Sequence, residues 1–274
     1  MRFASWRLVE EVLTLSSVAL ELVDSRDPLN TRCLKLERLA ARLGRPVIVV
    51  INKADLVPRW VCEAWVRYFK EVEGLESIYI SAQRRLGTRV LRKKVVEVAE
   101  RVGAREKVVV SVFGIPKVGK STLINTLKGR HSATTSPYPG TPGYTTKARL
   151  YRIGGKLYLV DTPGVLPPEG GGVESLIRSK PVDELENPIK VATELVAKVL
   201  KYNPKAFEVA YGTTSTTAEG ILEHIARKRG WVRGGEPDLY EAAKALIRDY
   251  LDGRIVYYYE PPANPPSSPS DPRS

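Results

Sequence analysis

The residues with the clearest chemical meaning lie near the middle of the chain, in the segment Gly114-Ile-Pro-Lys-Val-Gly-Lys-Ser121. The segment fits the pattern G-x-x-x-x-G-K-[ST], in which glycines let successive backbone N–H groups face a phosphate. Lys120 is expected to reach the β- and γ-phosphates of a nucleotide, and Ser121 is expected to ligate Mg²⁺. The segment therefore predicts a phosphate-binding loop. Its expected contact residues are Pro116, Lys117, Val118, Gly119, Lys120, Ser121 and Thr122.

The base of the nucleotide is predicted by Asn52-Lys53-Ala54-Asp55, which directly follows an apolar run at 47–51. The carboxylate of Asp55 can accept hydrogen bonds from two adjacent N–H donors, which guanine has at N1 and N2 and adenine lacks. A site built on such a pair discriminates strongly against the analogue without it. A simple turn is the alternative interpretation, because asparagine and aspartate favour turns. Asn52, Lys53 and Asp55 are the predicted guanine-binding residues.

Two further segments occupy similar places after apolar runs. Ser81 and Ala82 follow the run 77–80 and are expected to bring a backbone N–H to the base oxygen. Asp161-Thr-Pro-Gly164 follows the run 157–160, so Asp161 is expected to hold Mg²⁺ through water, and the Gly164 N–H is expected to meet the γ-phosphate. All four segments follow predicted strands, where open α/β sheets bind their ligands. This shared placement favours a nucleotide site over four unrelated turns.

The hydrophobic pattern predicts the sheet that positions these segments. The predicted strands are apolar on both faces and alternate with helical patterns, which is typical of an α/β fold with a mostly parallel sheet flanked by helices. The strands are expected at 17–23, 47–51, 77–80, 108–113 and 157–160, and the helices at 34–43, 59–72, 88–102 and 121–127.

The strand signal stops near residue 185, and only helical patterns follow, at 188–203, 217–228 and 239–251. We therefore predict three parts of the chain. The nucleotide-binding domain is expected to occupy 1–185, a small all-helical domain is expected at 186–262, and a disordered tail rich in proline and serine is expected at 263–274.

The chain carries 43 Lys and Arg against 31 Asp and Glu, a net charge of +12, which favours a polyanionic partner. The basic residues gather in two clusters, and a solvated helix face is the alternative interpretation for either one alone. Two clusters on so basic a chain favour a nucleic-acid partner over an incidental charge run. The first cluster is Arg84, Arg85, Arg89, Arg92, Lys93, Lys94, Arg101, Arg105 and Lys107, and the second is Arg227, Lys228, Arg229 and Arg233.

Several classes of protein are disfavoured by the sequence. No apolar run approaches the ~18–20 residues of a membrane span, and Glu10 and Glu11 interrupt the apolar N-terminal stretch, unlike a signal peptide. Two cysteines and two histidines do not predict a disulfide framework or a structural zinc site. We therefore expect a cytoplasmic protein without a membrane or DNA partner, and no oligomer is implied.

The order of the segments, NKAD, SAQ, GKS and then DTPG, resembles the circularly permuted GTPases of ribosome assembly. This family includes the bacterial YlqF/RbgA type and the archaeal and eukaryotic nucleostemin-like group, whereas ordinary GTPases have GKS first. Asp24–Pro28 is similar to the DARxP segment of the family. Pro142-Gly-Tyr-Thr145 resembles its PGxT switch loop, which implies that Thr145 is the second Mg²⁺ ligand. Gly234–Pro262 is similar to its closing helix and following DGKIPYY-PP segment.

The resemblance implies a circularly permuted P-loop GTPase domain followed by the helical domain. It further implies a GTP-hydrolysing ribosome biogenesis factor that acts on the large subunit, with GTP/GDP and Mg²⁺ as ligands and GTP-gated binding and release. Lys120, Thr145 and Gly164 are then the catalytic residues. Val165 has no polar atom to orient the attacking water, so turnover is expected to be slow until the ribosomal particle activates it. The alternatives are a GTPase that acts on another RNA, in tRNA processing or translation, and a nucleotide-gated scaffold without turnover.

Two features leave alternatives open. Lys117 stands where the family usually has an asparagine that is associated with a bound potassium ion. Its ammonium could bring a fixed charge to the phosphates, or it could point outward to solvent or rRNA. Tyr257, Tyr258 and Tyr259 could stack on bases, or they could belong to a packed segment.

Overall fold

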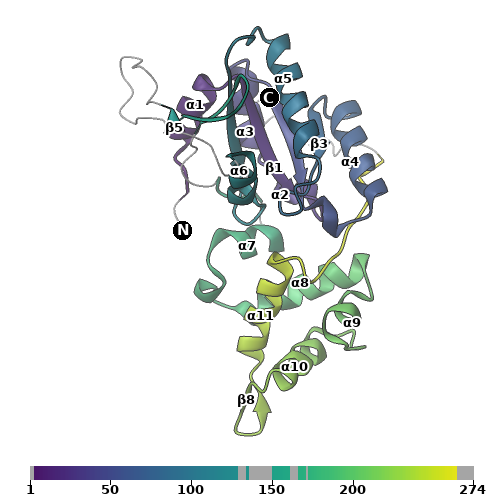
Figure 1. Ribbon diagram of the computed structural model, residues 1–274. Helices are drawn as coiled ribbons and strands as arrows, with labels where there is room; N and C mark the ends of the chain where they lie inside the picture. The colour runs from purple at the N-terminus through teal and green to yellow at the C-terminus, as the bar shows by residue number, and fades with distance from the viewer. Residues whose placement is uncertain (1–2, 129–133, 136–149, 161–165, 171, 264–274) are drawn as a thin grey trace, which may run out of the picture.

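The computed structural model describes residues 3–128, 134–135, 150–160, 166–170 and 172–263. These residues form an α/β domain built on one large sheet and a helical domain beneath it, as Figure 1 shows. The polypeptide returns from the helical domain to the α/β domain near its C-terminal end, so residues far apart in the sequence meet at the junction between the domains.

The described residues form a seven-stranded sheet in the order β3-β2-β1-β4-β7-β6-β5. Its parallel part is confirmed where the sequence predicts it, because runs of β-branched residues suit strands that are covered on both faces. Only the edge formed by β6 and β5 is antiparallel. The strands are β1 (Val18–Asp24), β2 (Val47–Asn52), β3 (Glu76–Tyr79), β4 (Val108–Gly114), β5 (Thr134–Thr135), β6 (Leu150–Gly154) and β7 (Leu157–Val160).

Successive residues of the central strands pack into different clusters. In β2, Val49 and Ile51 belong to a cluster formed with α4, whereas Ile48 and Val50 pack into the larger core of the sheet. This two-residue alternation follows from the pleat of the strand, and β1, β2 and β4 are buried along their whole length. The helices of this domain are α1 (Trp6–Leu15), α2 (Pro28–Thr31), α3 (Leu34–Arg42), η1 (Ala54–Leu56), α4 (Arg59–Glu71), α5 (Thr88–Arg101) and α6 (Lys120–Lys128).

The helical domain has a core of its own. Leu195 and Val199 of one helix pack with Ile221, Leu246 and other buried side chains of its neighbours. Its elements are α7 (Val173–Ser179), η2 (Val182–Glu184), α8 (Pro188–Tyr202), α9 (Ala206–Tyr211), α10 (Ala218–Lys228), the hairpin of β8 (Val232–Arg233) and β9 (Glu236–Pro237), and α11 (Leu239–Leu251).

Helix α7 contributes to this core although it precedes residue 185, because Val173 and Ile177 pack with the later helices. The division of the chain at residues 185 and 262 stays a prediction, and the predicted tail from 264 onward lies outside the described residues. Within the described part of the chain, no helix is both long and apolar enough to cross a bilayer.

Candidate nucleotide-binding site

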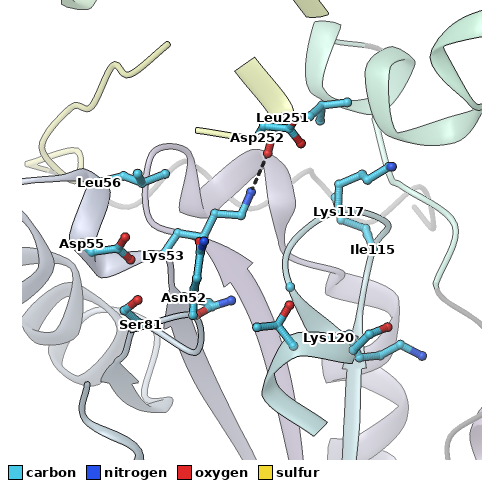
Figure 2. A pocket seen from close by; sticks show the side chains of 14 residues that line it. Asn52, Lys53, Asp55, Leu56, Ser81, Ile115, Lys117, Lys120, Leu251 and Asp252 are labelled. Carbon is cyan, nitrogen blue, oxygen red and sulfur yellow. Dashed lines mark hydrogen bonds between the residues drawn. The ribbon is translucent and has the colours of Figure 1, made fainter. Parts of the chain in front are cut away.

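A cavity of about 600 Å³ lies where the predicted guanine-binding segment, the phosphate loop and the end of α11 meet (Figure 2). It adjoins the C-terminal ends of β2 and β4, the edge at which α/β sheets bind ligands. The structure thereby brings together segments that are up to 200 positions apart in the sequence. The cavity is lined by Asn52, Lys53, Asp55, Leu56, Ser81, Gln83, Ile115, Lys117, Gly119, Lys120, Ser121, Thr122, Leu251 and Asp252.

The glycines of the phosphate loop are required by close contacts. Gly119 has φ +103°, and a Cβ at this position would lie 2.3 Å from the Nδ2 atom of Asn52. A Cβ at Gly114 would lie 2.8 Å from Val118 Cγ2 and 3.1 Å from the Leu22 carbonyl oxygen. The backbone therefore turns between β4 and α6 in a space that admits no side chain, and it leaves Lys120 and Ser121 at the start of the helix.

Asn52 joins three of the predicted segments. Its side-chain amide donates a hydrogen bond to the carbonyl of Val118 over 2.8 Å, and its carbonyl oxygen accepts the backbone N–H of Ala82 over 3.0 Å. The sequence predicts that Ser81 and Ala82 bring a backbone N–H to the base oxygen; the Ala82 N–H is bonded to Asn52, and Ala82 does not line the cavity. A buried N–H takes the nearest acceptor, so Asn52 acts in this structure as the brace between the loops.

Lys53 points toward the helical domain, as Figure 2 shows. Its Nζ lies 3.0 Å from Asp24 Oδ2 and donates to the carbonyl of Leu251 over 3.1 Å. Burial lowers the pKa of Lys53 to about 8, although the neighbouring Asp24 carboxylate acts in the opposite direction. Lys53 therefore links the guanine-binding segment to α11.

Asp55 and Ser81 lie on the opposite wall from α11 (Figure 2). Ser81 is held by backbone hydrogen bonds in both directions with Leu86, and its hydroxyl accepts the N–H of Arg84 over 3.1 Å. The Asp55 carboxylate lies 3.8 Å from Arg84 Nε and lines the cavity. The predicted base-binding carboxylate thus faces the same space as the phosphate loop.

Two of the three apolar residues of the phosphate loop are placed differently from the polar ones, whereas Ile115 lines the cavity. Pro116 and Val118 do not line the cavity, and Val118 is fully buried. The Pro116 carbonyl accepts a hydrogen bond from Arg178 Nη1 over 3.2 Å. Lys117 lines the cavity with an exposed side chain that Figure 2 shows directed away from Asn52, and its φ is +69°.

Three predicted site residues, Thr145, Asp161 and Gly164, lie outside the described residues. The residues that flank the last two are placed next to the phosphate loop. Strand β7, which ends at Val160, pairs with β4, and the N–H of Leu166 donates to the carbonyl of Gly114 over 3.1 Å.

Five cavity residues were not predicted from the sequence. Leu56, Gln83 and Ile115 adjoin predicted segments, so proximity along the chain could have indicated them. Leu251 and Asp252 come from the helical domain. The residue that could have indicated them is Gly253, which follows the end of α11 and has φ +86°. A Cβ on Gly253 would lie 2.9 Å from Leu56 Cδ1, so the turn after α11 packs closely against the guanine-binding segment.

Asp24 is the centre of a buried ionic network between the domains. Its carboxylate accepts hydrogen bonds from Arg26 over 2.8 and 2.9 Å and from Arg178 over 3.1 Å, and it also pairs with Lys53. Burial raises the pKa of Asp24, but the charges of Arg26, Lys53 and Arg178 outweigh this effect and hold it well below its usual range. The carboxylate is therefore ionised and fully paired.

The two arginines carry the network into the helical domain. Arg26 donates to the carbonyls of Tyr250 and Ile255, and its guanidinium lies 4.1 Å from the centre of the Tyr250 ring. Arg178, on α7, also donates to Glu174 over 2.9 Å. One cluster of charges thus contacts the phosphate loop, the guanine-binding segment and both ends of the helical domain.

Comparison with known proteins places the chain in a family. The sequence model of a family described as "50S ribosome-binding GTPase" matches residues 109–223. The chain is 34% identical to an uncharacterized GTP-binding protein of Methanocaldococcus jannaschii, over 92% of this chain and 66% of that protein. It is 31% identical to nucleolar GTP-binding protein 2 of Yarrowia lipolytica, over 94% of this chain and 51% of that protein. The chain belongs to the circularly permuted GTPase family.

A solved structure shows the same fold. The GDP-bound YlqF of T. maritima matches with a TM-score of 0.67 at 23% identity, over 92% of this chain and 98% of that one. The chain spans 66% of the length of the Methanocaldococcus jannaschii protein and 51% of the length of the Yarrowia lipolytica protein. In the permuted arrangement, the elements that precede the phosphate-loop strand β4 form one side of the sheet and those that follow it form the other.

The tyrosines near the C-terminal end of this permuted GTPase are packed. Tyr257 is fully buried, and its hydroxyl donates to Asp27 over 2.9 Å and to Glu174 over 3.1 Å. The Tyr259 hydroxyl also donates to Asp27, and its backbone carbonyl accepts the indole N–H of Trp65 over 3.1 Å. These contacts favour the packed-segment interpretation over base stacking.

The two basic clusters differ in how many of their charges are paired. In the second cluster, Arg229 pairs with Asp249, Arg233 pairs with Asp238, and Lys228 donates to the carbonyl of Tyr211. The first cluster also has structural members, because Arg92 donates to the carbonyls of Ile153 and Leu127, and Lys94 and Arg101 pair with Glu76. Its remaining members are exposed, and two of them, Arg84 and Arg85, directly follow the cavity residue Gln83 in the chain.

Proposed function

We propose that the protein binds and hydrolyses GTP and acts in ribosome biogenesis. The observation that carries this proposal is the single cavity that Asp55, Ser81, Lys120 and Ser121 line together. These residues supply a base-reading carboxylate at one end and a cationic phosphate loop at the other, as a guanine nucleotide requires. The names of two relatives, which describe them as GTP-binding, support the same activity.

The proposed binding mode assigns one role to each wall of the cavity. Asp55 accepts hydrogen bonds from N1–H and N2–H of guanine, beside Ser81 on the same wall. The backbone N–H groups of the loop and Lys120 surround the phosphates, and the N-terminal end of α6 adds its positive dipole. Ser121 exposes a hydroxyl oxygen in the cavity, a hard ligand that suits Mg²⁺, with Thr145 and Asp161 as the further proposed ligands. When bound, Mg²⁺ would neutralise charge on the β- and γ-phosphates.

Hydrolysis on this site is proposed to be slow in the isolated protein. Lys120 and the N–H of Gly164 would stabilise the charge that develops on the transferred phosphoryl group. Val165, next to Gly164, provides no polar atom to orient the attacking water. The missing group is therefore supplied by the ribosomal particle or by another element of the chain.

We expect GTP turnover to rise by at least tenfold when purified large ribosomal subunits are added, since a group that orients the nucleophile contributes on the order of 10²-fold or more. Phosphate release from GTP, measured with and without subunits at equal salt, checks this expectation. The Lys120→Ala variant is the control, because it should show no stimulation. Fast hydrolysis that subunits do not change would contradict the proposal, and negligible turnover with every partner would favour a nucleotide-gated scaffold.

The proposed partner is a ribosomal particle, specifically the large subunit, in the cytoplasm. The net charge of +12 and the exposed residues of the first basic cluster would supply phosphate contacts, so affinity should fall steeply with salt. Nucleolar GTP-binding protein 2 and the family description "50S ribosome-binding GTPase" support this partner. A GTPase that acts on another RNA is the alternative, and binding to free tRNA but not to subunits would favour it.

The proposed gating follows from the position of α7. This helix begins just after the DTPG segment, its Arg178 contacts the Pro116 carbonyl and Asp24, and its Val173 and Ile177 pack in the helical domain. A change in the DTPG segment when the γ-phosphate binds would therefore be passed to the helical domain. Binding in the GTP state and release after hydrolysis would follow from two such arrangements.

Lys117 gives a test of the cation requirement. Its exposed ammonium lies at the cavity wall, where relatives usually carry the asparagine associated with potassium. If this charge acts on the phosphates, hydrolysis should be equal within about twofold in potassium and sodium buffers, and Lys117→Asn should create a potassium preference. Steady-state turnover at matched ionic strength measures both. Strong potassium activation of the unaltered protein would assign Lys117 to the outer surface instead.

A further inference from the structure

The helical domain completes one wall of the nucleotide cavity. Leu251 is the last residue of α11, and Asp252 caps the helix. Both line the cavity, although the remaining lining residues belong to the α/β domain. Figure 1 shows α11 running from the β8–β9 hairpin toward the sheet domain, so only its C-terminal end reaches the nucleotide site.

This end of α11 is fixed in position by contacts on both sides of Asp252. The Leu251 carbonyl accepts a hydrogen bond from Lys53, and Gly253, which has φ +86°, packs against the Leu56 side chain. Next along the chain, the Ile255 carbonyl accepts a hydrogen bond from the buried Arg26 over 3.1 Å. Asp252 is therefore held at the cavity wall by a rigid turn.

The carboxylate of Asp252 is available to a ligand. The side chain is exposed, and within the described part of the chain it has no hydrogen bond or ion pair. Figure 2 places it across the cavity from Asn52 and Ser81, above Lys53 and between the guanine-binding segment and Lys117 of the phosphate loop. It thus lines the space that a nucleotide would fill.

The chemistry of a carboxylate identifies the part of the nucleotide that it can contact. An ionised carboxylate only accepts hydrogen bonds and is repelled by phosphate. The donors on the edge of guanine are already assigned to Asp55. The donors that remain, between base and phosphates, are the ribose hydroxyls, and acidic side chains bind ribose hydroxyls in other nucleotide sites.

We propose that Asp252 accepts a hydrogen bond from a ribose hydroxyl of the bound guanine nucleotide, so that the helical domain contributes directly to nucleotide affinity and to the choice of ribose over deoxyribose. This proposal rests on the proposed function, because it takes a guanine nucleotide as the occupant of the cavity. It makes Asp252 a specificity-determining residue that lies outside every predicted binding segment.

Calorimetric titration of the full chain with GDP, 2′-deoxyGDP and 3′-deoxyGDP tests the proposal. The unaltered protein should bind one of the deoxy analogues roughly tenfold more weakly than GDP, as expected for the loss of a hydrogen bond to a charged group. Asp252→Ala should bind GDP roughly tenfold more weakly than the unaltered protein does and should bind that analogue with unchanged affinity. The ratio of its dissociation constants for the analogue and for GDP therefore falls to about one. Asp252→Asn keeps an acceptor oxygen, so its affinity for GDP should lie between those of the unaltered protein and Asp252→Ala.

Glu236→Ala is the matched control, because it removes an exposed carboxylate from the same domain at the far hairpin and should keep the original ratio. Equal ratios in the unaltered protein and Asp252→Ala would overturn the proposal. Failure of the unaltered protein to bind GDP would instead refute the proposed function, so the two failures are distinct.

Discussion

Replacement of Asp55 by asparagine is expected to exchange the base preference of the site from guanine to xanthine. The carboxylate accepts from two donors on guanine, N1–H and N2–H, whereas an asparagine amide would present its own N–H to the N2–H. Xanthine has an oxygen in place of the N2 amino group, which that amide can satisfy. Because unpaired polar groups in such sites are costly, GDP affinity should fall by a factor of about 10⁴.

The exchange is measured by titration of the Asp55→Asn variant with GDP and XDP. The variant should bind XDP better than GDP, in the reverse order of the unaltered protein. Asp183→Asn, an equivalent change at an exposed position of the helical domain, should leave both affinities unchanged. Retention of GDP affinity by Asp55→Asn would show that Asn52–Asp55 is a simple turn and that the base is read elsewhere.

Removal of the Arg26 side chain is expected to cause a large loss in the free energy of unfolding. Arg26→Ala deprives the buried Asp24 of two hydrogen bonds and leaves the Tyr250 and Ile255 carbonyls without their donor. Loss of one partner from a buried ion pair costs about 3–5 kcal/mol, because the remaining charge stays buried. The free energy of unfolding from urea denaturation, followed by tryptophan fluorescence, should fall by that amount.

Arg7→Ala is the control for this measurement. Arg7 also pairs with a carboxylate, Glu11, but its side chain is 84% exposed. Exposed pairs of this kind contribute about 0.5 kcal/mol or less. If the loss for Arg26→Ala were equally small, the ionic network would not be what joins the two domains.

The fold and the phosphate loop could be predicted because their determinants are local. Strands β2 and β4 are rich in apolar β-branched residues and β1 is mostly apolar, and the predicted bounds of all three agree with the structure within one residue. Gly114 and Gly119 are dictated by the turn that they form. Helix α1 and the antiparallel edge strand β6 were missed. Strand β6 mixes buried and exposed residues and lacks the fully apolar pattern of the parallel strands.

The contribution of α11 to the site could not be predicted, because it depends on how two domains dock. Lys53 and Leu251 are separated by 198 positions, and no local pattern indicates that they meet. The pairing of a charge in the second basic cluster likewise depends on packing. Asp249, which pairs with Arg229, lies 20 positions away on another helix. Tyr257 and Tyr259 likewise find Asp27 across the junction between the domains.

The proposed gating of ribosome binding by the guanine nucleotide site can be tested by sedimentation with purified ribosomal subunits. The full chain would be centrifuged with small or large subunits at one fixed salt concentration, in the presence of a non-hydrolysable GTP analogue or GDP. We expect co-sedimentation with large subunits that is at least tenfold stronger with the analogue and is lost in Lys120→Ala. Equal binding with the analogue and GDP, or binding to neither subunit, would contradict this expectation.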